Sequence, residues 1–220
     1  MQAAPSPVRL VDGRRVWLRP LNAGDAARLI DLCGRLSPET RRRRFLRSTY
    51  RCDATEAERL AAVDQVQRVA FALAQSRERD APIVGVGRFH AQSSERAEFA
   101  LLVEDAYQHL GLGRLLLDNL IGEAYRRGLR GLDGHVLYDN RPMLQLLRTS
   151  GYPVEVRWDG ATCSACNFTS SRSRPSRGLR GTPKAVGGGG PRRATPTSPL
   201  SGGGAASRAA PCRQDPASAA

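Results

Sequence analysis

The chain has 220 residues, of which 40% are hydrophobic, and a formal net charge of +13 at pH 7. This length is enough for one domain of about 150–170 residues together with a tail. The sequence has no run of about 18 apolar residues, and its N-terminal residues lack the apolar segment of a signal peptide, so we expect neither a membrane span nor secretion. Five cysteines without a secretory context favour a reducing, cytoplasmic location.

The composition changes near residue 170. Residues 171–220 contain 40 Ser, Arg, Pro, Gly or Ala residues and no aromatic residue, and they carry about +8 of the net charge. Such a segment buries too little apolar surface to offset the entropy lost on ordering. We therefore predict a folded domain at 1–170 and a disordered, solvated tail at 171–220. Nucleic acid is not an expected partner, because aromatic residues are few and no known binding motif is present.

The first segments predict a hairpin and a helix. Val8–Leu10 and Val16–Pro20 have strand character and flank a turn signal at Asp12 and Gly13. A helix over residues 25–36 should follow, because apolar residues recur there at helical spacing. Its expected buried stripe consists of Ala26, Leu29, Ile30 and Cys33.

A second helix is predicted from Pro38 to Phe45, with Ser37 as its N-cap. It contains four consecutive arginines, Arg41–Arg44, which point around the helix and are interpreted as a solvated surface. Residues 56–66 have the pattern of a third helix.

Strands and helices then follow at regular spacing. The resulting order predicts an α+β fold with a mixed sheet. The expected strands are 69–74, 83–90, 97–103 and 132–137, the helices are 114–127 and 140–151, and a hairpin covers 154–158 and 161–168.

The most informative pattern lies between residues 98 and 117. The apolar run Phe99–Val103 is typical of a buried strand, and a polar turn leads through Gly111 and Gly113 into the next helix. A helix N-terminus offers unpaired N–H groups and a favourable dipole, and glycines let a ligand approach the backbone. We therefore expect a phosphate-binding cradle. It is neither a P-loop, since the Lys-Ser/Thr pair is missing, nor a Rossmann motif, since the spacing differs.

The order Gln108-x-x-Gly111-x-Gly113 after a strand resembles the acetyl-CoA signature of the GNAT N-acetyltransferases. Within that superfamily the chain looks most similar to the acetyltransferase domain of bacterial protein lysine acetyltransferases, the type that modifies acyl-CoA synthetases. The resemblance implies the GNAT fold, a mixed, mostly antiparallel central sheet flanked by helices, with acetyl-CoA as co-substrate. It covers about residues 8–168 and is carried by segments 12–25, 36–45, 96–117 and 140–152.

The resemblance also implies which residues bind the cofactor. The backbone of Leu101, Leu102 and Val103 would pair with the pantetheine arm as an added strand does, with the neighbouring strand splayed away. Asn140 matches an Asn that contacts the cofactor in the family, although its position before Pro142 equally suits a helix N-cap. The cradle that would hold the pyrophosphate consists of Gln108, His109, Leu110, Gly111, Leu112, Gly113 and Arg114.

Glu98 is the candidate general base. An amine with a pKa of about 10.4 arrives charged at neutral pH and must lose a proton before it can attack a thioester. Glu98 is the only acid within the strand that leads to the cradle, and it matches the general-base Glu of the resembled lysine acetyltransferases. The alternative is an ordinary exposed strand Glu. The general acid stays unassigned, with Tyr107, Tyr138 and solvent as candidates.

These residues predict an acetyl-CoA-dependent N-acetyltransferase that transfers the acetyl group directly to an amine, most readily a protein lysine. The alternatives are an acetyltransferase for small amines and a degenerate GNAT domain that binds acyl-CoA as a sensor. No metal is expected, since Cys163 and Cys166 would point to opposite faces of a strand. The sequence does not determine the oligomeric state.

Overall fold

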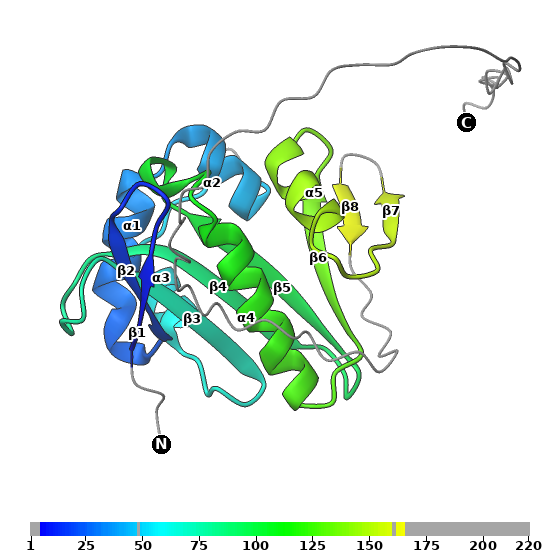
Figure 1. The fold of residues 1–220 in the computed structure, drawn as a ribbon, viewed down its shortest axis with the longest axis horizontal. Coiled ribbons are helices and arrows are strands. Elements are labelled where there is room, and N and C mark those ends of the chain that lie inside the picture. The colour runs from blue at the N-terminus through cyan, green and yellow to red at the C-terminus, as the bar shows by residue number, and fades with distance from the viewer. Residues whose placement is uncertain (1–4, 48, 160–161, 166–220) are drawn as a thin grey trace, which may run out of the picture. The chain divides into compact units, whose positions relative to one another are not determined.

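A mixed sheet forms the centre of the described part of the molecule (Figure 1). The structure, a computed structural model, describes residues 5–47, 49–159 and 162–165, so the predicted tail at 171–220 lies outside the described residues. Eight strands pair in the order β1-β2-β3-β4-β5-β6-β8-β7. Their bounds are β1 Ser6–Arg9, β2 Arg15–Pro20, β3 Arg68–Ala74, β4 Ile83–Ala91, β5 Arg96–Val103, β6 Gly131–Leu137, β7 Val156–Asp159 and β8 Thr162–Ala165.

Neighbouring strands run antiparallel except for β5 and β6, which are parallel. The parallel pair arises because the chain between these strands crosses over as a long helix, whereas hairpins or short connections join the antiparallel pairs within β3 to β5. The predicted mixed, mostly antiparallel sheet is therefore confirmed.

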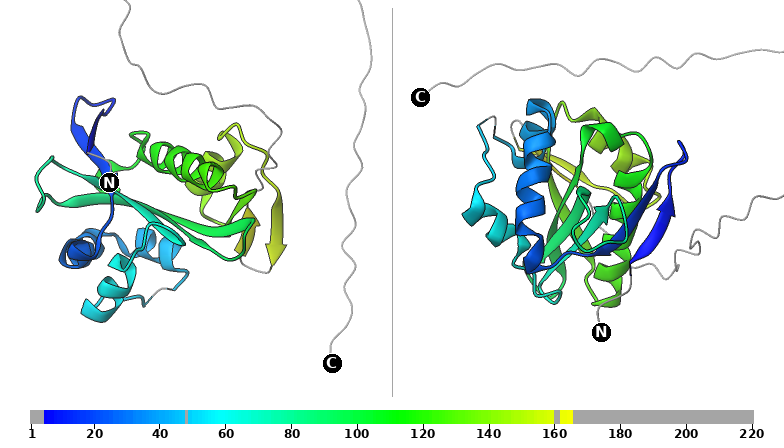
Figure 2. Two further views of the ribbon diagram at one scale, coloured as in Figure 1. Left: turned by 90° about the horizontal axis from the view of Figure 1, so that it is seen from below. Right: turned by 90° about the vertical axis from the view of Figure 1, so that its left-hand side faces the viewer.

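Helices cover both faces of this sheet. Figure 2 shows the helices of the N-terminal part, in blue and cyan, on one face and the long green helix on the other. One core cluster joins the first group to β3, β4 and β5, and another joins α4 and α5 to the strands on the opposite face. The helices are α1 Ala26–Arg35, α2 Pro38–Phe45, α3 Ala54–Ala61, α4 Leu112–Arg126 and α5 Arg141–Arg148, with 3-10 turns at Ala23–Asp25 and Asp105–Tyr107.

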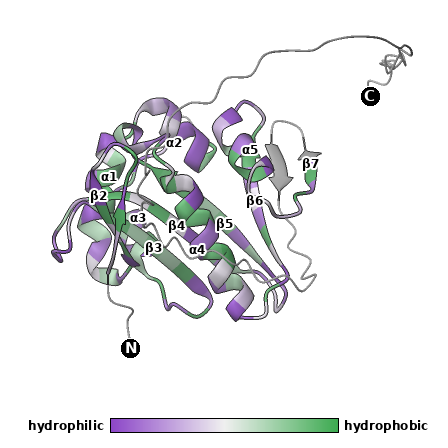
Figure 3. Cartoon of the chain, viewed as in Figure 1, coloured by the Kyte–Doolittle hydropathy of each residue, from purple (hydrophilic) through white to green (hydrophobic). Residues whose placement is uncertain are grey.

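The helix α4 packs closely on β4 and β5. Its leucines and alanine at helical spacing face the sheet. Each leucine that is fully buried stabilises the fold by about 1.5–3 kcal/mol. Figure 3 shows the apolar strands beneath this helix. Gly87 makes the approach possible, because a Cβ there would lie 3.1 Å from the Cβ of Leu116. The buried residues of α4 are Leu112, Leu116, Leu117, Leu120, Ile121 and Ala124.

Two local predictions were wrong. Ile30 was expected in the buried stripe of α1, but its side chain is 37% exposed and Leu32 is buried in its place. The helix predicted over 56–66 ends at Ala61. A turn replaces its second half, because the side chain of Asp64 accepts hydrogen bonds from the N–H groups of Val66, Gln67 and Arg68.

The strands β5 and β6 separate part-way along their length. Their register consists of three pairs, Arg96 with Gly131, Ala97 with Leu132 and Glu98 with Asp133. Beyond Glu98, β5 continues to Val103 with only β4 as its partner, and β6 continues to Leu137 with β8. The predicted splay next to residues 101–103 is therefore present, and it leaves one edge of β5 open inside the protein. No helix of the described residues is long and apolar enough to span a bilayer.

Candidate active site

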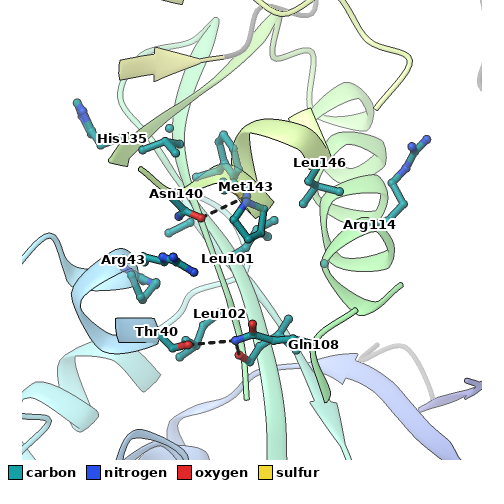
Figure 4. A pocket seen from close by; sticks show the side chains of 18 of the residues that line it. Thr40, Arg43, Leu101, Leu102, Gln108, Arg114, His135, Asn140, Met143 and Leu146 are labelled. Atoms are coloured by element: carbon teal, nitrogen blue, oxygen red, sulfur yellow. Dashed lines mark hydrogen bonds between the residues drawn. The ribbon is translucent and has the colours of Figure 1, made fainter. Parts of the chain in front are cut away.

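A cavity of about 300 Å³ lies where β5 and β6 separate. Figure 4 shows side chains from α2, the cradle, α5 and the two strands converging on it. The lining from β5 is Phe99–Val103, a continuous run of residues along the open edge of this strand. The other lining residues are Thr40, Arg43, Arg44, Gln108, His109, Gly111, Gly113, Arg114, Gly134, His135, Val136, Asn140, Pro142, Met143 and Leu146.

The N-terminus of α4 forms one end of this cavity. Gly111 is the N-cap residue with φ at +84°, and no side chain caps the helix. A Cβ at Gly111 would meet nothing within 4 Å, so space does not require glycine here. The left-handed backbone conformation favours it instead. His109 also has a positive φ, of 60°. The turn thus presents the first N–H groups of a 15-residue helix to the cavity, an arrangement suited to a phosphate.

Gln108 stabilises this turn with its side chain. Its Nε2 donates to Thr40 Oγ1 at 3.1 Å and to the carbonyl oxygen of Val103 at 3.2 Å (Figure 4). Thr40 Oγ1 in turn donates to Asp105 Oδ1 at 2.7 Å, and the backbone N–H of Ser37 donates to the other carboxylate oxygen at 2.9 Å. Gln108 therefore joins the cradle, the end of β5 and the start of α2.

Asp105 is the charged centre of that network, and the sequence patterns did not single it out. Burial alone would raise the pKa of its carboxyl group, but hydrogen bonds from Ser37 and Thr40 outweigh that effect and lower the pKa below its ordinary value. The carboxylate thereby holds α2 against the cradle. A Ser-x-x-Thr pattern at a helix start is too common to have revealed this partner.

The structure brings most of the predicted cofactor-binding residues to the cavity. Leu110 and Leu112 are the exceptions among the cradle residues, since neither lines the cavity and both pack in the core beneath it. Arg114 lines the cavity, but its Nε lies 2.8 Å from Asp118 Oδ1, and its Nη1 donates to the carbonyl oxygen of Thr149 at 2.9 Å. Its charge is thus already paired.

Asn140 serves as the N-cap of α5, since its Oδ1 accepts a hydrogen bond from the N–H of Met143 at 3.2 Å (Figure 4). It also lines the cavity. The two interpretations of this residue are therefore compatible in space, although the side-chain oxygen is already used by the helix.

Glu98 lies just outside the cavity. It occupies the last position at which β5 pairs with β6, opposite Asp133, and its side chain is exposed with Gln92 Nε2 3.4 Å from Oε2. Ala100 is two residues further along the same face of β5 and does line the cavity. Successive residues on one face of a strand are about 7 Å apart. Glu98 therefore stands at the mouth of the cavity on the side of α2.

The arginines of α2 are not the solvated surface that we expected. None of Arg41–Arg44 is fully exposed, and Arg43 and Arg44 line the cavity together with Thr40. Positions 40, 43 and 44 share one face of a helix, so this spacing was the available signal. Arg43 Nε lies 2.7 Å from Glu39 Oε1, and Arg42 Nη2 lies 3.0 Å from the same oxygen.

The described residues contain no group of three or more His, Cys, Asp or Glu side chains that could hold a metal ion. Cys166, one half of the C-x-x-C pattern, lies outside the described residues.

Sequence comparison agrees with this geometry. A profile of the acetyltransferase (GNAT) family matches residues 37–152, a range that includes α2, the cradle and α5. The chain belongs to this family. This GNAT protein is thus an N-acetyltransferase, with the fold that the resemblance implied.

Two relatives are similar in sequence. Acetyltransferase PA5475 of Pseudomonas aeruginosa is 34% identical over 144 residues, which are 65% of this chain and 77% of that protein. Acetyltransferase Pat of Mycolicibacterium smegmatis is 31% identical over 157 residues, which are 70% of this chain and 46% of that protein. The GNAT protein thus matches about half the length of Pat.

Solved structures are similar in fold. The GNAT domain of S. lividans PAT superposes with a TM-score of 0.66 at 26% identity, over 74% of this chain and 95% of that one. The PaiA N-acetyltransferase of Thermoplasma acidophilum, solved in complex with coenzyme A, has a TM-score of 0.55 at 16% identity, over 70% of this chain and 98% of that one. At the latter identity the likeness shows the fold alone.

Proposed function

We propose that this GNAT protein transfers an acetyl group from acetyl-CoA to an amine, with a protein lysine as acceptor and Glu98 as general base. One observation carries the proposal: the open edge of β5 and the uncapped N-terminus of α4 meet in a single cavity. A ligand with an amide-rich arm and a pyrophosphate matches both. The arm can hydrogen-bond to the strand edge, and the phosphates can bind the helix N–H groups.

The lining of the cavity suits such an arm. Between the strand edge and α5 it is apolar, with Phe99, Leu101, Val136, Met143 and Leu146 as its main side chains. Contacts to the arm would come mostly from the backbone of Leu101–Val103. The carbonyl of Val103 already accepts from Gln108, which fixes the direction of the strand end. No metal is part of the proposal.

Chemically, the acceptor nitrogen must lose a proton as its bond to the acyl carbon forms and the carbon–sulfur bond breaks. Glu98 can accept that proton directly or through one water molecule, since it stands at the cavity mouth on the α2 side. The leaving thiolate needs a proton of its own. Neither Tyr107 nor Tyr138 lines the cavity, and Tyr138 is 64% exposed, so solvent is the best candidate for its source.

A protein lysine is favoured as the acceptor because the four matching segments resemble protein lysine acetyltransferases and because Pat is among the relatives. The small-amine acetyltransferase and the acyl-CoA sensor are the competing functions. The cytoplasmic location that the cysteines favour stays a prediction.

Incubation of the purified full chain with labelled acetyl-CoA distinguishes these functions. Lysine-containing proteins, including acyl-CoA synthetases, and a panel of small amines serve as acceptors, while calorimetry measures acetyl-CoA binding. Protein labelling at lysine supports the proposal, and transfer to small amines alone would indicate the first competitor. Binding without any transfer would make the protein a sensor, and no binding at all would contradict the assigned site.

A further inference from the structure

Arg44 differs from its neighbours in α2 because, in the described part of the chain, its guanidinium has neither an ion pair nor a hydrogen bond, whereas Arg41 donates to the carbonyl oxygens of Cys33 and Leu36. Arg44 lines the main cavity and also a second, smaller cavity of about 20 Å³ beneath α1 and α3. Its guanidinium carbon lies 4.8 Å from the centre of the Phe45 ring. Within the described residues Arg44 makes no hydrogen bond or ion pair, whereas Arg42 and Arg43 are both paired with Glu39. Arg44 is therefore a cation of the α2 wall that has no acidic partner of its own among the residues that the structure describes.

A second guanidinium lies nearby. Arg88, on β4, lines the same small cavity and donates from Nη2 to the carbonyl oxygen of Leu60 at 2.9 Å. Burial and the charge of Arg44 together lower the pKa of Arg88 to about 10, and burial also lowers the pKa of Arg44. The two like charges thus disfavour each other.

The described acids in this region form no ion pair with these two arginines, although the charges of Glu98 and Glu56 act against the effect of burial on the pKa of Arg44. Glu56 binds Arg59, with 2.6 Å between its Oε1 and Nη2, and accepts from the hydroxyl of Tyr50 at 2.9 Å. Glu98 is exposed beside Gln92. Among the described residues, no acid lies within ion-pair distance of Arg44 or Arg88. An uncompensated cation in a cavity costs free energy unless an anion binds there, which makes such a cation a candidate for ligand recognition.

We propose that Arg44, with Arg88 behind it, forms a carboxylate-binding subsite at the α2 end of the cavity. This inference rests on the proposed function and names the chemistry of its substrate. The fork of a guanidinium matches a carboxylate in shape and charge. Because Arg44 shares the cavity with the open edge of β5, the bound carboxylate belongs to a molecule that reacts there. It is carried either by the acyl group of the donor, as in succinyl-CoA, or by the acceptor amine.

Both cases use the same balanced transfer. The acceptor nitrogen forms a bond to the acyl carbon, the carbon–sulfur bond breaks, the nitrogen gives up a proton, and the thiolate gains one. The carboxylate takes no part in bond making. It only orients the molecule that bears it, so the step needs no oxidant, reductant or further reactant.

The donor arm of the test compares succinyl-CoA with butyryl-CoA, its neutral counterpart of the same chain length, by calorimetry on the purified full chain. We expect wild type to bind succinyl-CoA at least about tenfold more tightly, since a hydrogen-bonded charge pair of this kind is worth roughly that factor. Arg44→Met should abolish the preference. Arg43→Met is the matched control, because Arg43 lines the same cavity but is already paired with Glu39, and this variant should keep the preference.

The acceptor arm uses acetyl-CoA and compares kcat/KM for 4-aminobutanoate with that for butylamine, in the same three proteins. A preference of about tenfold for the acid, lost only in Arg44→Met, places the carboxylate on the acceptor. A preference in the donor arm places it on the acyl group. The subsite is overturned if the neutral molecule performs as well as the acid in both arms, or if Arg43→Met and Arg44→Met lose the preference equally.

The melting temperature of Arg44→Met and a second variant, Arg44→Gln, complete the experiment. The free Arg44→Met protein should melt at the same temperature as wild type or higher, because an unpaired, half-buried charge has been removed. Arg44→Gln, neutral but polar, replaces it if the Met variant does not fold, and the same loss of preference is expected. Failure of all acetyl transfer would contradict the proposed function, whereas intact acetyl transfer without any acid preference contradicts the subsite alone.

Discussion

Arg42 of α2 and Asp139 of the loop between β6 and α5 form an ion pair, with 2.5 Å between Nη2 and Oδ2. The two residues come from opposite walls of the cavity, since α2 contributes Thr40 to one wall and α5 contributes Met143 to the other. Hydrogen bonds from Arg42 to Glu39 and Asp139 raise the pKa of the guanidinium above its ordinary value. The pair thus ties α2 to the loop that precedes α5.

Loss of this ion pair should weaken acetyl-CoA binding more than it lowers the stability of the fold. Both side chains are about one-third exposed, so we expect Asp139→Asn to leave the melting temperature nearly unchanged. The KM for acetyl-CoA should rise by about two- to fivefold, which corresponds to the free energy that a partly exposed ion pair contributes. Steady-state kinetics at low and high salt checks this, since the wild-type advantage should shrink as salt screens the pair. An unchanged KM at low salt would show that the walls do not depend on the pair.

Substitution of the cradle glycines should abolish acetyl-CoA binding. Gly111→Asp places a side chain in a left-handed position, at a strain of about 1 kcal/mol, and sets a negative charge against the phosphate site. Gly113→Asp adds the same charge next to Leu146. The measurement is the rise in melting temperature on addition of acetyl-CoA, which mass action predicts for a ligand of the folded state. Gly122→Asp, in the middle of α4, is the control and should keep the shift.

Glu98→Gln preserves the size of the side chain but removes the proton acceptor. We expect turnover to fall by about 10²–10⁴-fold at pH 7, with little change in acetyl-CoA affinity. The deficit should diminish at high pH, where more of the acceptor amine is already neutral. Glu95→Gln serves as the control, since Glu95 is also exposed and precedes β5. Near-normal turnover of Glu98→Gln at pH 7 would make Glu98 a structural residue.

Asp25 should make the stability of the fold depend on pH. Its side chain is fully buried, and it binds Arg19 Nη2 at 2.7 Å and Arg28 Nη1 at 2.8 Å. Burial opposes ionisation, yet hydrogen bonds from Arg19 and Asn22 lower the pKa below its ordinary value. The contribution of Asp25 to the free energy of unfolding is therefore complete above the pKa of about 3.9 that it has in the unfolded chain. It is lost as the pH falls through the lower pKa of the folded state. Asp25→Ala should cost about 3–5 kcal/mol, because Arg19 would stay buried without its partner.

Urea unfolding of wild type and Asp25→Asn between pH 7 and pH 2 checks this dependence. The free energy of unfolding should fall more steeply below pH 4 in wild type than in the variant, so that the two curves converge in acid. Parallel curves would mean that Asp25 does not titrate in this window.

Removal of residues 171–220 should leave both folding and acetyl-CoA binding intact. The composition of this segment is the reason, since it has almost no apolar surface to bury. Circular dichroism on heating and calorimetry with acetyl-CoA compare the shortened and full chains. Loss of a cooperative transition in the shortened chain would show that the segment packs against the domain.

Periodicity predicted the elements well, and local side-chain contacts account for the misses. Strands such as β5 and the helix α4 have strong apolar patterns, and both lie close to where the sequence placed them. The end of α3 depends on Asp64 folding its carboxylate back over three N–H groups, which apolar spacing does not reveal.

The cradle was predictable in the same way, because its glycines and the strand before it are local features. The positions of the α2 arginines at the cavity were not predictable in this way. Whether Arg44 faces solvent or a cavity depends on how α2 lies over β5. That placement is fixed by hydrogen bonds between Thr40 of α2 and Asp105 and Gln108, which come from a distant part of the chain. Ionic pairing across 97 residues, as between Arg42 and Asp139, leaves no trace in the pattern of either segment.

The open stretch of β5 is an unsatisfied sheet edge, and exposed edges ordinarily invite foreign strands and aggregation. Here residues of α2, α4 and α5 line the cavity beside the edge and enclose it. In the proposed function, the narrow pantetheine arm completes the sheet at this edge. The walls of the cavity thus also shield the edge of β5 from pairing with strands of other protein molecules.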